Sequence, residues 1–81
     1  MRILYFARLR ERFGVAEETL DAAPASVADL VELLRARGGV WAEELAPGKR
    51  FRVAVDQTLA TPEAPLAAGA EVAIFPPVTG G

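Results

Sequence analysis

The sequence predicts a small two-layer α+β domain, in which one main helix covers one face of a mixed β-sheet. Two observations predict this fold class. Only residues 26–35 have the full apolar spacing of a buried helix face, and short runs with the alternation of strands lie on both sides of them. The chain has 81 residues, which is enough for one domain with a small core. We expect this domain over residues 1–75 and a flexible tail over residues 76–81.

Two strands are expected before the helix. Residues 2–9 form the first, and its alternation places Ile3 and Tyr5 on one face and Phe6 on the other. Residues 16–22 form a weaker second strand, whose acidic side chains suit the edge of a sheet.

The main helix is expected to begin after Ser26, because a serine hydroxyl is a good N-cap. The Asp29 carboxylate can interact favourably with the exposed amide groups of the first turn and with the helix dipole. Gly38 and Gly39 are expected to end the helix. Four side chains at the spacing i, i+3, i+4 and i+7 form its buried face: Val27, Leu30, Val31 and Leu34.

The second half of the chain is expected to supply the rest of the sheet. Residues 41–45 form a short helical turn, which Pro47 stops. Residues 51–55 alternate as a third strand, residues 58–60 form a very short one, and residues 70–75 form the last.

These elements define a core and leave one face of the sheet open. Because only one helix is long enough to cover the sheet, Phe6, Leu59 and Phe75 are expected to form an exposed apolar patch beside the tail. Such patches mark partner docking, and the alternative is that loops fold over this one. Trp41 is expected to cover the edge of the core. The expected core members are Ile3, Tyr5, Leu20, Val27, Leu30, Val31, Leu34, Val53, Val55, Leu66, Val72 and Ile74.

The composition excludes several kinds of site. The chain has no Cys and no His, which removes disulfides, thiol nucleophiles, Cys/His metal sites and the commonest general base. Two pairs of neighbouring carboxylates remain, Glu17-Glu18 and Glu43-Glu44. Neighbours in sequence point in different directions on a strand or a helix, so we interpret both pairs as surface charge.

Charge and hydropathy limit the partners. The net charge of −2 predicts no nucleic-acid partner. Arg8, Arg10 and Arg12 are locally basic and are interpreted as a solvated loop or as a rim contact to an acidic partner. No apolar run reaches the ~18 residues of a membrane helix, and no signal peptide is visible. We therefore expect a cytoplasmic protein with no membrane partner.

The chain ends with Pro-Pro-Val-Thr-Gly-Gly, directly after the last expected strand. Two terminal glycines occur by chance in roughly 0.5% of sequences. The prolines direct the chain away from the body, and glycines let a narrow slot close around the backbone. This pattern indicates that the carboxylate of Gly81 is the working group, which adenylation would activate. The alternatives are a frayed terminus or an expression scar.

A β-grasp topology with a projecting Gly-Gly tail resembles the ubiquitin-like sulfur-carrier proteins and, within them, the small-subunit family of molybdopterin synthase. The resemblance spans essentially the whole chain, although Asp56 stands where an Asn is often seen. The terminal segment, prolines included, is the most specific part. The segments that carry the resemblance are Tyr5-Phe6-Ala7 with Arg10-Glu11, Gly48-Lys49, Ala54-Val55-Asp56-Gln57-Thr58-Leu59, and residues 69–81.

The resemblance implies a sulfur carrier in molybdenum cofactor biosynthesis. An E1-like adenylating enzyme would use ATP to activate the Gly81 carboxylate, and sulfur transfer would convert the adenylate to a thiocarboxylate. The tail would then enter the large subunit of molybdopterin synthase, where the sulfur passes to a pterin precursor for the dithiolene. This accounts for sulfur chemistry in a chain without cysteine.

The resemblance also assigns roles and partners. The chain would be non-catalytic alone, would bind no cofactor or metal, and would assemble with the large subunit as a heterotetramer. The catalytic lysines would belong to the large subunit, and ATP would belong to the activating enzyme. The tail residues Val78, Thr79 and Gly80 would line the threaded path. The docking face of the family would be matched by Phe6, Leu59 and Phe75.

Three rival functions stay open on the residues alone. The chain could carry sulfur for thiamine synthesis or tRNA thiolation, because the carrier chemistry is the same. It could be a ubiquitin-like modifier that forms isopeptide bonds with lysines, because that role also uses an adenylate. It could be a binding module with an inert tail, in which case deleting Gly81 leaves every activity intact.

Overall fold

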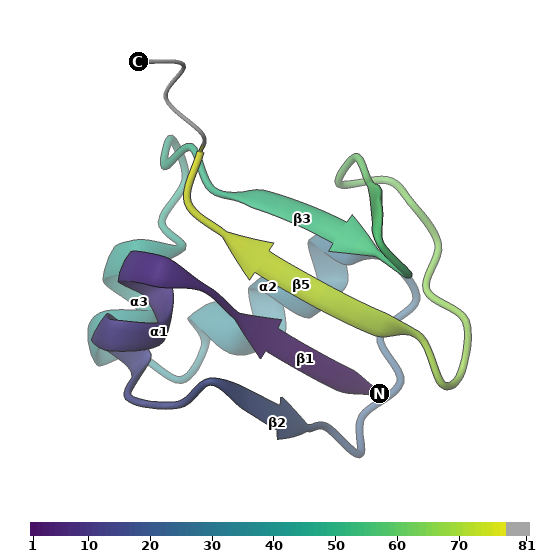
Figure 1. The fold of residues 1–81 in the computed structure, drawn as a ribbon. Helices are drawn as coiled ribbons and strands as arrows, with labels where there is room; N and C mark the ends of the chain where they lie inside the picture. Colours follow the sequence, from purple (N-terminus) through teal and green to yellow (C-terminus); the bar gives the residue numbers. More distant parts are fainter. Residues whose placement is uncertain (78–81) are drawn as a thin grey trace.

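Strands and helices form two layers in the computed structural model, which describes residues 1–77 (Figure 1). The α+β class predicted from the sequence is confirmed. The strands are β1 (Arg2–Tyr5), β2 (Glu17–Thr19), β3 (Arg52–Val55), β4 (Thr58–Leu59) and β5 (Glu71–Phe75). The helices are α1 (Ala7–Phe13), α2 (Val27–Arg35) and α3 (Gly39–Glu44).

The sheet is mixed, and its strand order is β2-β1-β5-β3-β4. The first and last strands, β1 and β5, are parallel neighbours at its centre, whereas the other pairs are antiparallel. Tyr5 of β1 and Val53 of β3 both lie opposite Ile74 of β5, so three buried side chains form one row across the sheet. The tail therefore leaves the sheet beside the end of β1.

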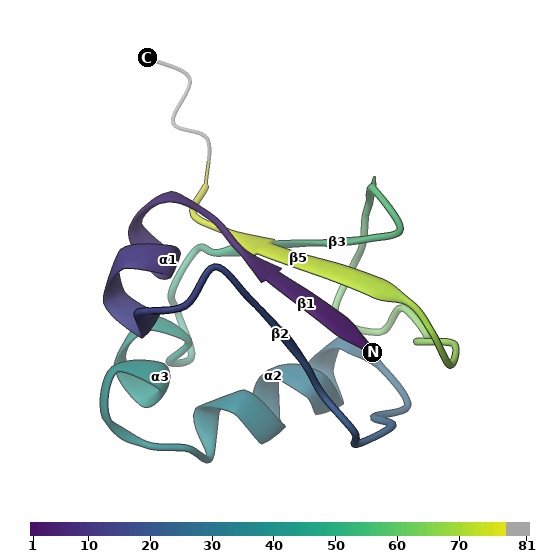
Figure 2. The same ribbon diagram turned by 60° about the horizontal axis from the view of Figure 1, so that its bottom comes forward.

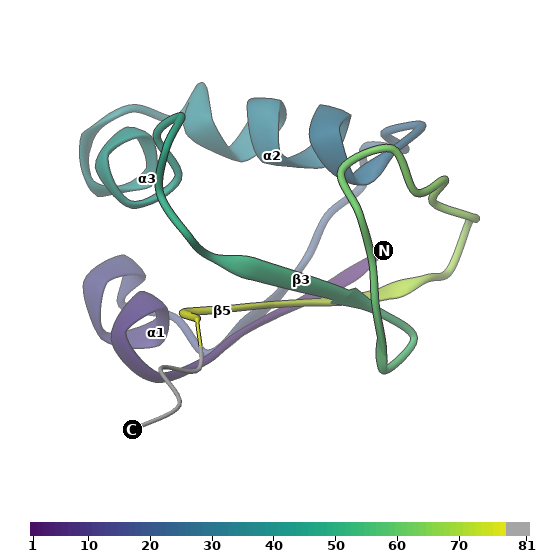
Figure 3. The ribbon, with the colours of Figure 1, turned by 90° about the horizontal axis from the view of Figure 1, so that it is seen from above.

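Helices α2 and α3 lie on the same face of the sheet (Figures 2 and 3). Helix α1 lies at one end of the sheet, close to where β5 ends (Figure 3). The opposite face of the sheet carries no helix of residues 1–77. The prediction of one open face is confirmed for this part of the chain.

The expected strand over residues 2–9 is wrong beyond Tyr5, because the chain turns into helix α1. Leu9 and Phe13, four residues apart, are the buried positions of this helix. Burying both requires helical spacing, which a straight strand cannot supply. Gly14 ends α1 in the left-handed region, with φ of 75°.

Helix α2 begins as predicted. The Ser26 Oγ accepts a hydrogen bond from the Asp29 N–H at 3.2 Å, and the four expected apolar side chains are buried. The helix ends at Arg35, before the expected glycines. Gly38, with φ of 77°, is instead the N-cap of α3. A left-handed residue at this point allows the chain to reverse between two helices with a very short link.

The core contains nine of the twelve expected side chains. The other three, Leu20, Val55 and Leu66, are only partly buried at its margin. Five buried residues were not expected: Leu9, Phe13, Leu45, Ala54 and Ala70. The first three belong to α1 and to the end of α3, two helices that the sequence pattern did not predict or predicted as shorter.

An aromatic cluster closes the core between α1 and α3. Phe13 and Trp41 are stacked with ring centroids 3.8 Å apart, and both meet the ring of Tyr5 edge-on. The Arg37 guanidinium lies 4.4 Å from the centroid of the Trp41 ring. The predicted role of Trp41 as a cover of the core edge is confirmed.

Candidate functional site

The root of the tail lies at the end of β5, next to the junction between β1 and α1 (Figure 1). The Phe6 N–H donates a hydrogen bond to the Ile74 carbonyl at 3.2 Å. This bond continues the pairing of β1 with β5 by one residue. Phe6 therefore lies beside Phe75, where the tail begins.

The open face of the sheet has an apolar surface that reaches from this root to β4. Phe6 is 45% exposed and Leu59 is 69% exposed, whereas Phe75 is partly buried. Leu59 lies opposite Ala54, and Ala54 lies opposite Ala73. These two alanines lie between the larger side chains, and Ala54 is buried. We name the surface made by Phe6, Leu59, Phe75, Ala54 and Ala73 the docking face.

A tight hairpin joins β3 to β4, the edge strand that carries Leu59. Val55 pairs with Thr58 across a two-residue turn, in which Asp56 has φ of 48° and Gln57 has φ of 70°. Both values fit the type I′ turn, whose twist matches that of the strands. The Asp56 carboxylate accepts a hydrogen bond from the Glu71 N–H at 3.1 Å, which fixes the turn to β5.

Ala7 joins β1 to α1 in a strained conformation. Its φ of 51° lies in the left-handed region, which L-residues other than Asn, Asp and Gly seldom adopt. The turn at Ala7 ends the strand directly after Phe6, so the Phe6 ring stays on the open face instead of entering the core.

A buried carboxylate holds α1 against α3. Glu44 is only 7% exposed, and its oxygens accept hydrogen bonds from Arg8 at 3.2 and 3.1 Å and from Arg12 at 2.9 Å. The Arg8 hydrogen bond is the main reason that the pKa of Glu44 lies below its ordinary value, and Arg12 acts in the same direction. We name these three residues the α1 clamp.

The α1 clamp corrects two predictions. Glu44 is not surface charge, although Glu43 beside it is exposed and pairs only with Arg12. Arg8, Arg10 and Arg12 do not form a solvated loop, because all three belong to α1. The sequence carried one usable signal, the spacing of four residues that places Arg8 and Arg12 on one side of a helix.

A second ion network closes the edge of the sheet. The Tyr5 hydroxyl donates to Glu18 at 2.5 Å, and the Arg37 guanidinium donates to both oxygens of Glu18 at 2.8 and 2.9 Å. Arg37 is the main cause of the lowered pKa of Glu18. Burial, followed by the Glu18 carboxylate, raises the pKa of the Tyr5 hydroxyl. The network joins β1, β2 and the link between α2 and α3.

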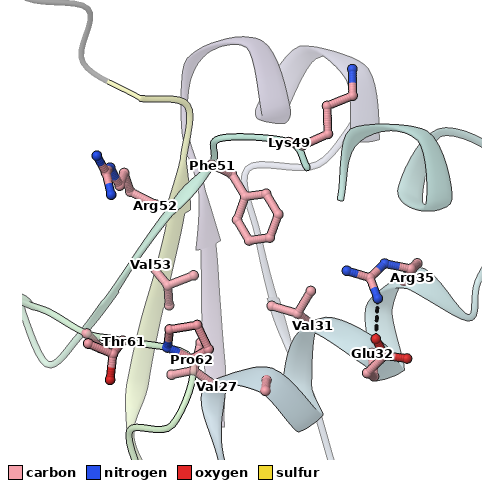
Figure 4. Close-up of a pocket in the computed structure, with 12 residues that line it drawn as sticks. Val27, Val31, Glu32, Arg35, Lys49, Phe51, Arg52, Val53, Thr61 and Pro62 are labelled. Atoms are coloured by element: carbon pink, nitrogen blue, oxygen red, sulfur yellow. Dashed lines mark hydrogen bonds and ion pairs between the residues drawn. The ribbon is translucent and has the colours of Figure 1, made fainter. Parts of the chain in front are cut away.

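A groove of about 450 Å³ lies between α2 and β3 (Figure 4). Its apolar lining includes Val31, Phe51 and Val53, and the ion pair between Arg35 and Glu32 lies at its side. These side chains come from the helix-covered side of β3, so the groove is separate from the docking face.

The structure brings together only part of the predicted site. Phe6 and Phe75 lie side by side, and Leu59 shares their face two strands away. The four tail positions lie outside the described residues: Val78, Thr79, Gly80 and Gly81. Their proposed roles, and the docking role of the three apolar residues, stay predictions. Residues 1–77 contain no group of three or more acidic, His or Cys side chains placed to hold a metal ion. No helix within residues 1–77 is long and apolar enough to span a bilayer.

Comparison with known proteins agrees with this arrangement. A model of the ThiS family matches residues 3–81. Two molybdopterin synthase sulfur carrier subunits, from Haemophilus influenzae and Escherichia coli, are each 41% identical over 81 residues, covering 100% of this chain and 99% of the relative.

Two solved structures share the fold. One is SAMP1 of Haloferax volcanii, a small archaeal modifier protein, with a TM-score of 0.80 and 28% sequence identity. The match covers 99% of this chain and 97% of the SAMP1 chain. A putative molybdopterin converting factor subunit 1 of Pyrococcus furiosus has a TM-score of 0.77, 27% identity and 95% coverage of both chains. The chain therefore belongs to the ThiS family and, within it, to the molybdopterin synthase sulfur carrier subunits.

Proposed function

We propose that this chain carries sulfur for molybdopterin synthesis on the carboxylate of Gly81. The observation that carries the proposal is the 41% identity over the full length of two sulfur carrier subunits, with the match extending through the terminal Gly-Gly. The role also fits a chain whose sequence has neither Cys nor His to perform sulfur chemistry itself.

The proposed cycle has three steps, all of which occur in partner proteins. A carboxylate oxygen of Gly81 attacks ATP in an E1-like enzyme, pyrophosphate leaves, and an acyl-adenylate forms. A sulfur nucleophile at the oxidation level of sulfide then attacks the acyl carbon, AMP leaves, and a thiocarboxylate remains. In the large subunit of molybdopterin synthase the sulfur passes to the pterin precursor, and water restores the carboxylate. We propose that the chain itself binds no cofactor and that it works in the cytoplasm, where the activating enzyme has access to ATP.

The docking face supports the proposed assembly with the large subunit. Apolar side chains that stay exposed on a small domain favour association, and here they adjoin the point from which the tail leaves. Docking through Phe6 and Phe75 would hold the tail at the mouth of a slot. Val78, Thr79 and Gly80 would then run through the slot to bring Gly81 to the pterin. We propose a heterotetramer of two such pairs.

C-terminal fragmentation mass spectrometry tests the carrier chemistry. The protein is incubated with the adenylating enzyme, ATP and a sulfur donor, and the mass of Gly81 is measured. Exchange of O for S must be localised to Gly81, because oxidation of Met1 changes the nominal mass by the same amount. A thiocarboxylate at Gly81 is the expected result. An unmodified Gly81, beside a control carrier that the same enzyme modifies, would refute the proposal.

A protein modifier is the second candidate, and the similarity to an archaeal modifier protein is the observation that favours it. Both functions begin with an adenylate at Gly81. Conjugates of high mass in a cell lysate that disappear on deletion of Gly81 would support a modifier. Sulfur carriage for thiamine synthesis or tRNA thiolation is a further alternative. Binding of this chain to the large subunit of molybdopterin synthase would support the proposed role against that alternative.

A further inference from the structure

A small hollow of about 180 Å³ lies at the root of the tail. It is bounded by the first turn of α1, the loop before β3 and the two prolines that follow β5. Three cationic residues line it, Arg8, Lys49 and Arg50, against one carboxylate, Glu44. Because Glu44 is already held within the α1 clamp, the hollow has an excess of positive charge.

This excess is local. The chain has a net charge of −2, and most of its arginines are paired with carboxylates. Lys49, Arg50 and Arg52 have no carboxylate partner within residues 1–77, and all three are exposed. The same holds for Arg10 on α1, which does not line the hollow. The arginines that do pair are Arg2, Arg8, Arg12, Arg35 and Arg37. We name Lys49, Arg50 and Arg52 the basic collar.

A tight turn presents the basic collar. The Lys49 N–H donates to the Ala46 carbonyl at 3.0 Å, and Pro47 and Gly48 occupy the two central positions. Gly48 has φ of 93°, which fits a type II turn with proline and glycine at these positions. The turn restricts the loop, so the two cations after it stay near the root.

Arg52 extends the positive charge onto the docking face. It lies directly opposite Phe75 in the pairing of β3 with β5. Figure 4 shows its side chain on the other side of β3 from Phe51 and Val53. The same view shows the Lys49 side chain extending away from the groove under β3. The collar therefore lies beside the root, on the side of β3, and two of its residues, Lys49 and Arg52, also border the groove between α2 and β3.

Chain length limits what the collar can contact. Four residues follow Pro77, and four extended residues span at most about 14 Å. A tail that enters a slot in extended form carries its carboxylate well away from the root. The collar would then face the surface around the mouth of the slot, whereas the reacting group and the phosphates of the adenylate lie deep inside.

We propose that the basic collar recognises an acidic rim on the large subunit, around the mouth of the slot that receives the tail. The inference rests on the proposed function, and it adds a specificity surface to the apolar docking face. Exposed charges of this kind attract a complementary surface before contact is made, so they act mainly on the association rate. Salt screens such attraction over a distance of about 10 Å at 0.1 M.

Association kinetics with the large subunit from the same organism test the proposal. The variant Lys49→Ala/Arg50→Ala removes two positive charges from exposed side chains that make no hydrogen bond within residues 1–77. We expect its association rate constant to fall about three- to ten-fold at about 50 mM salt. The difference should nearly vanish at about 300 mM salt, with the dissociation rate changed by less than about two-fold.

The matched control is Ala22→Glu/Ala23→Glu, which changes the net charge by the same amount on an exposed loop beside Met1, at the far end of the sheet. Its association rate should stay within about two-fold of wild type. Lys49→Arg/Arg50→Lys should keep the wild-type rate. The proposed role of the collar would be refuted if the alanine variant associated as fast as wild type. It would also be refuted if the Ala22→Glu/Ala23→Glu control slowed association as much as the alanine variant does; neither result would affect the proposed function. No binding of the wild-type protein would overturn both the collar and the proposed function.

Discussion

Replacing Glu44 by glutamine keeps the shape of the side chain and removes the charge of the α1 clamp. Three hydrogen bonds from two guanidinium groups then lose their ionised acceptor. Breaking a fully buried ion pair costs about 3–5 kcal/mol, and losing an exposed one costs about 0–1 kcal/mol. Glu44 is 7% exposed, but the side chains of Arg8 and Arg12 are 66% and 39% exposed, so solvent screens them. We expect a loss of about 2 kcal/mol in the free energy of unfolding at pH 7.

The effect should depend on pH in one direction. The pKa of Glu44 in the folded protein lies below its ordinary value of 4.5. A carboxyl with a lowered folded pKa stabilises the protein above the unfolded pKa, and the stabilisation is lost as the pH falls through the folded pKa. The difference in the free energy of unfolding between wild type and Glu44→Gln should therefore have its full size at about pH 6–7. It should decrease below about pH 4.5 and decrease further as Glu44 becomes protonated in the folded protein.

Urea unfolding followed by circular dichroism measures this difference across the pH range. Glu43→Gln is the matched control, because Glu43 is the preceding residue of α3 and pairs with Arg12 while its side chain is 65% exposed. The control should lose at most about 0.5 kcal/mol. A loss below about 0.5 kcal/mol in Glu44→Gln, or equal losses in both variants, would refute the reasoning.

Three further predictions concern the tail, the docking face and the strained junction. Deleting Gly81 should abolish thiocarboxylate formation in the mass-spectrometric assay and leave the melting temperature unchanged; a drop as large as that of a core mutant would contradict this. Phe75→Ala should weaken binding to the large subunit by about 2–4 kcal/mol in calorimetry, and unchanged affinity would remove Phe75 from the docking face. Ala7→Gly should raise the free energy of unfolding by about 0.5–1 kcal/mol, because glycine adopts φ of 51° without strain. A less stable Ala7→Gly variant would show that the junction is unstrained.

Local patterns predicted α2, the short strands and the open face. Ser26 and the apolar spacing after it determine where α2 begins, whatever lies elsewhere in the chain. The exposure of Phe6 and Leu59 followed from strand alternation and from the single long helix. The family followed from the terminal segment, and full-length identity confirms it.

The α1 helix and the α1 clamp were missed for different reasons. The alternation that begins at Ile3 continues through Phe6, and nothing in it marks the backbone reversal at Ala7. The burial of Glu44 depends on two arginines more than thirty residues away in the chain. Without α1 in place, those arginines have no predicted position, so the sequence could not distinguish Glu44 from Glu43.

The parallel pairing of β1 with β5 has a mechanical consequence. A partner that draws the tail into a slot pulls on the end of β5, which is hydrogen-bonded along both edges, to β1 on one side and to β3 on the other. A pull along a strand loads all of these bonds in shear, so they share the force and do not open one after another. Central strands also unfold only with the whole domain. If the tail is loaded and threaded as proposed, the sheet allows the domain to pass through repeated cycles without unfolding.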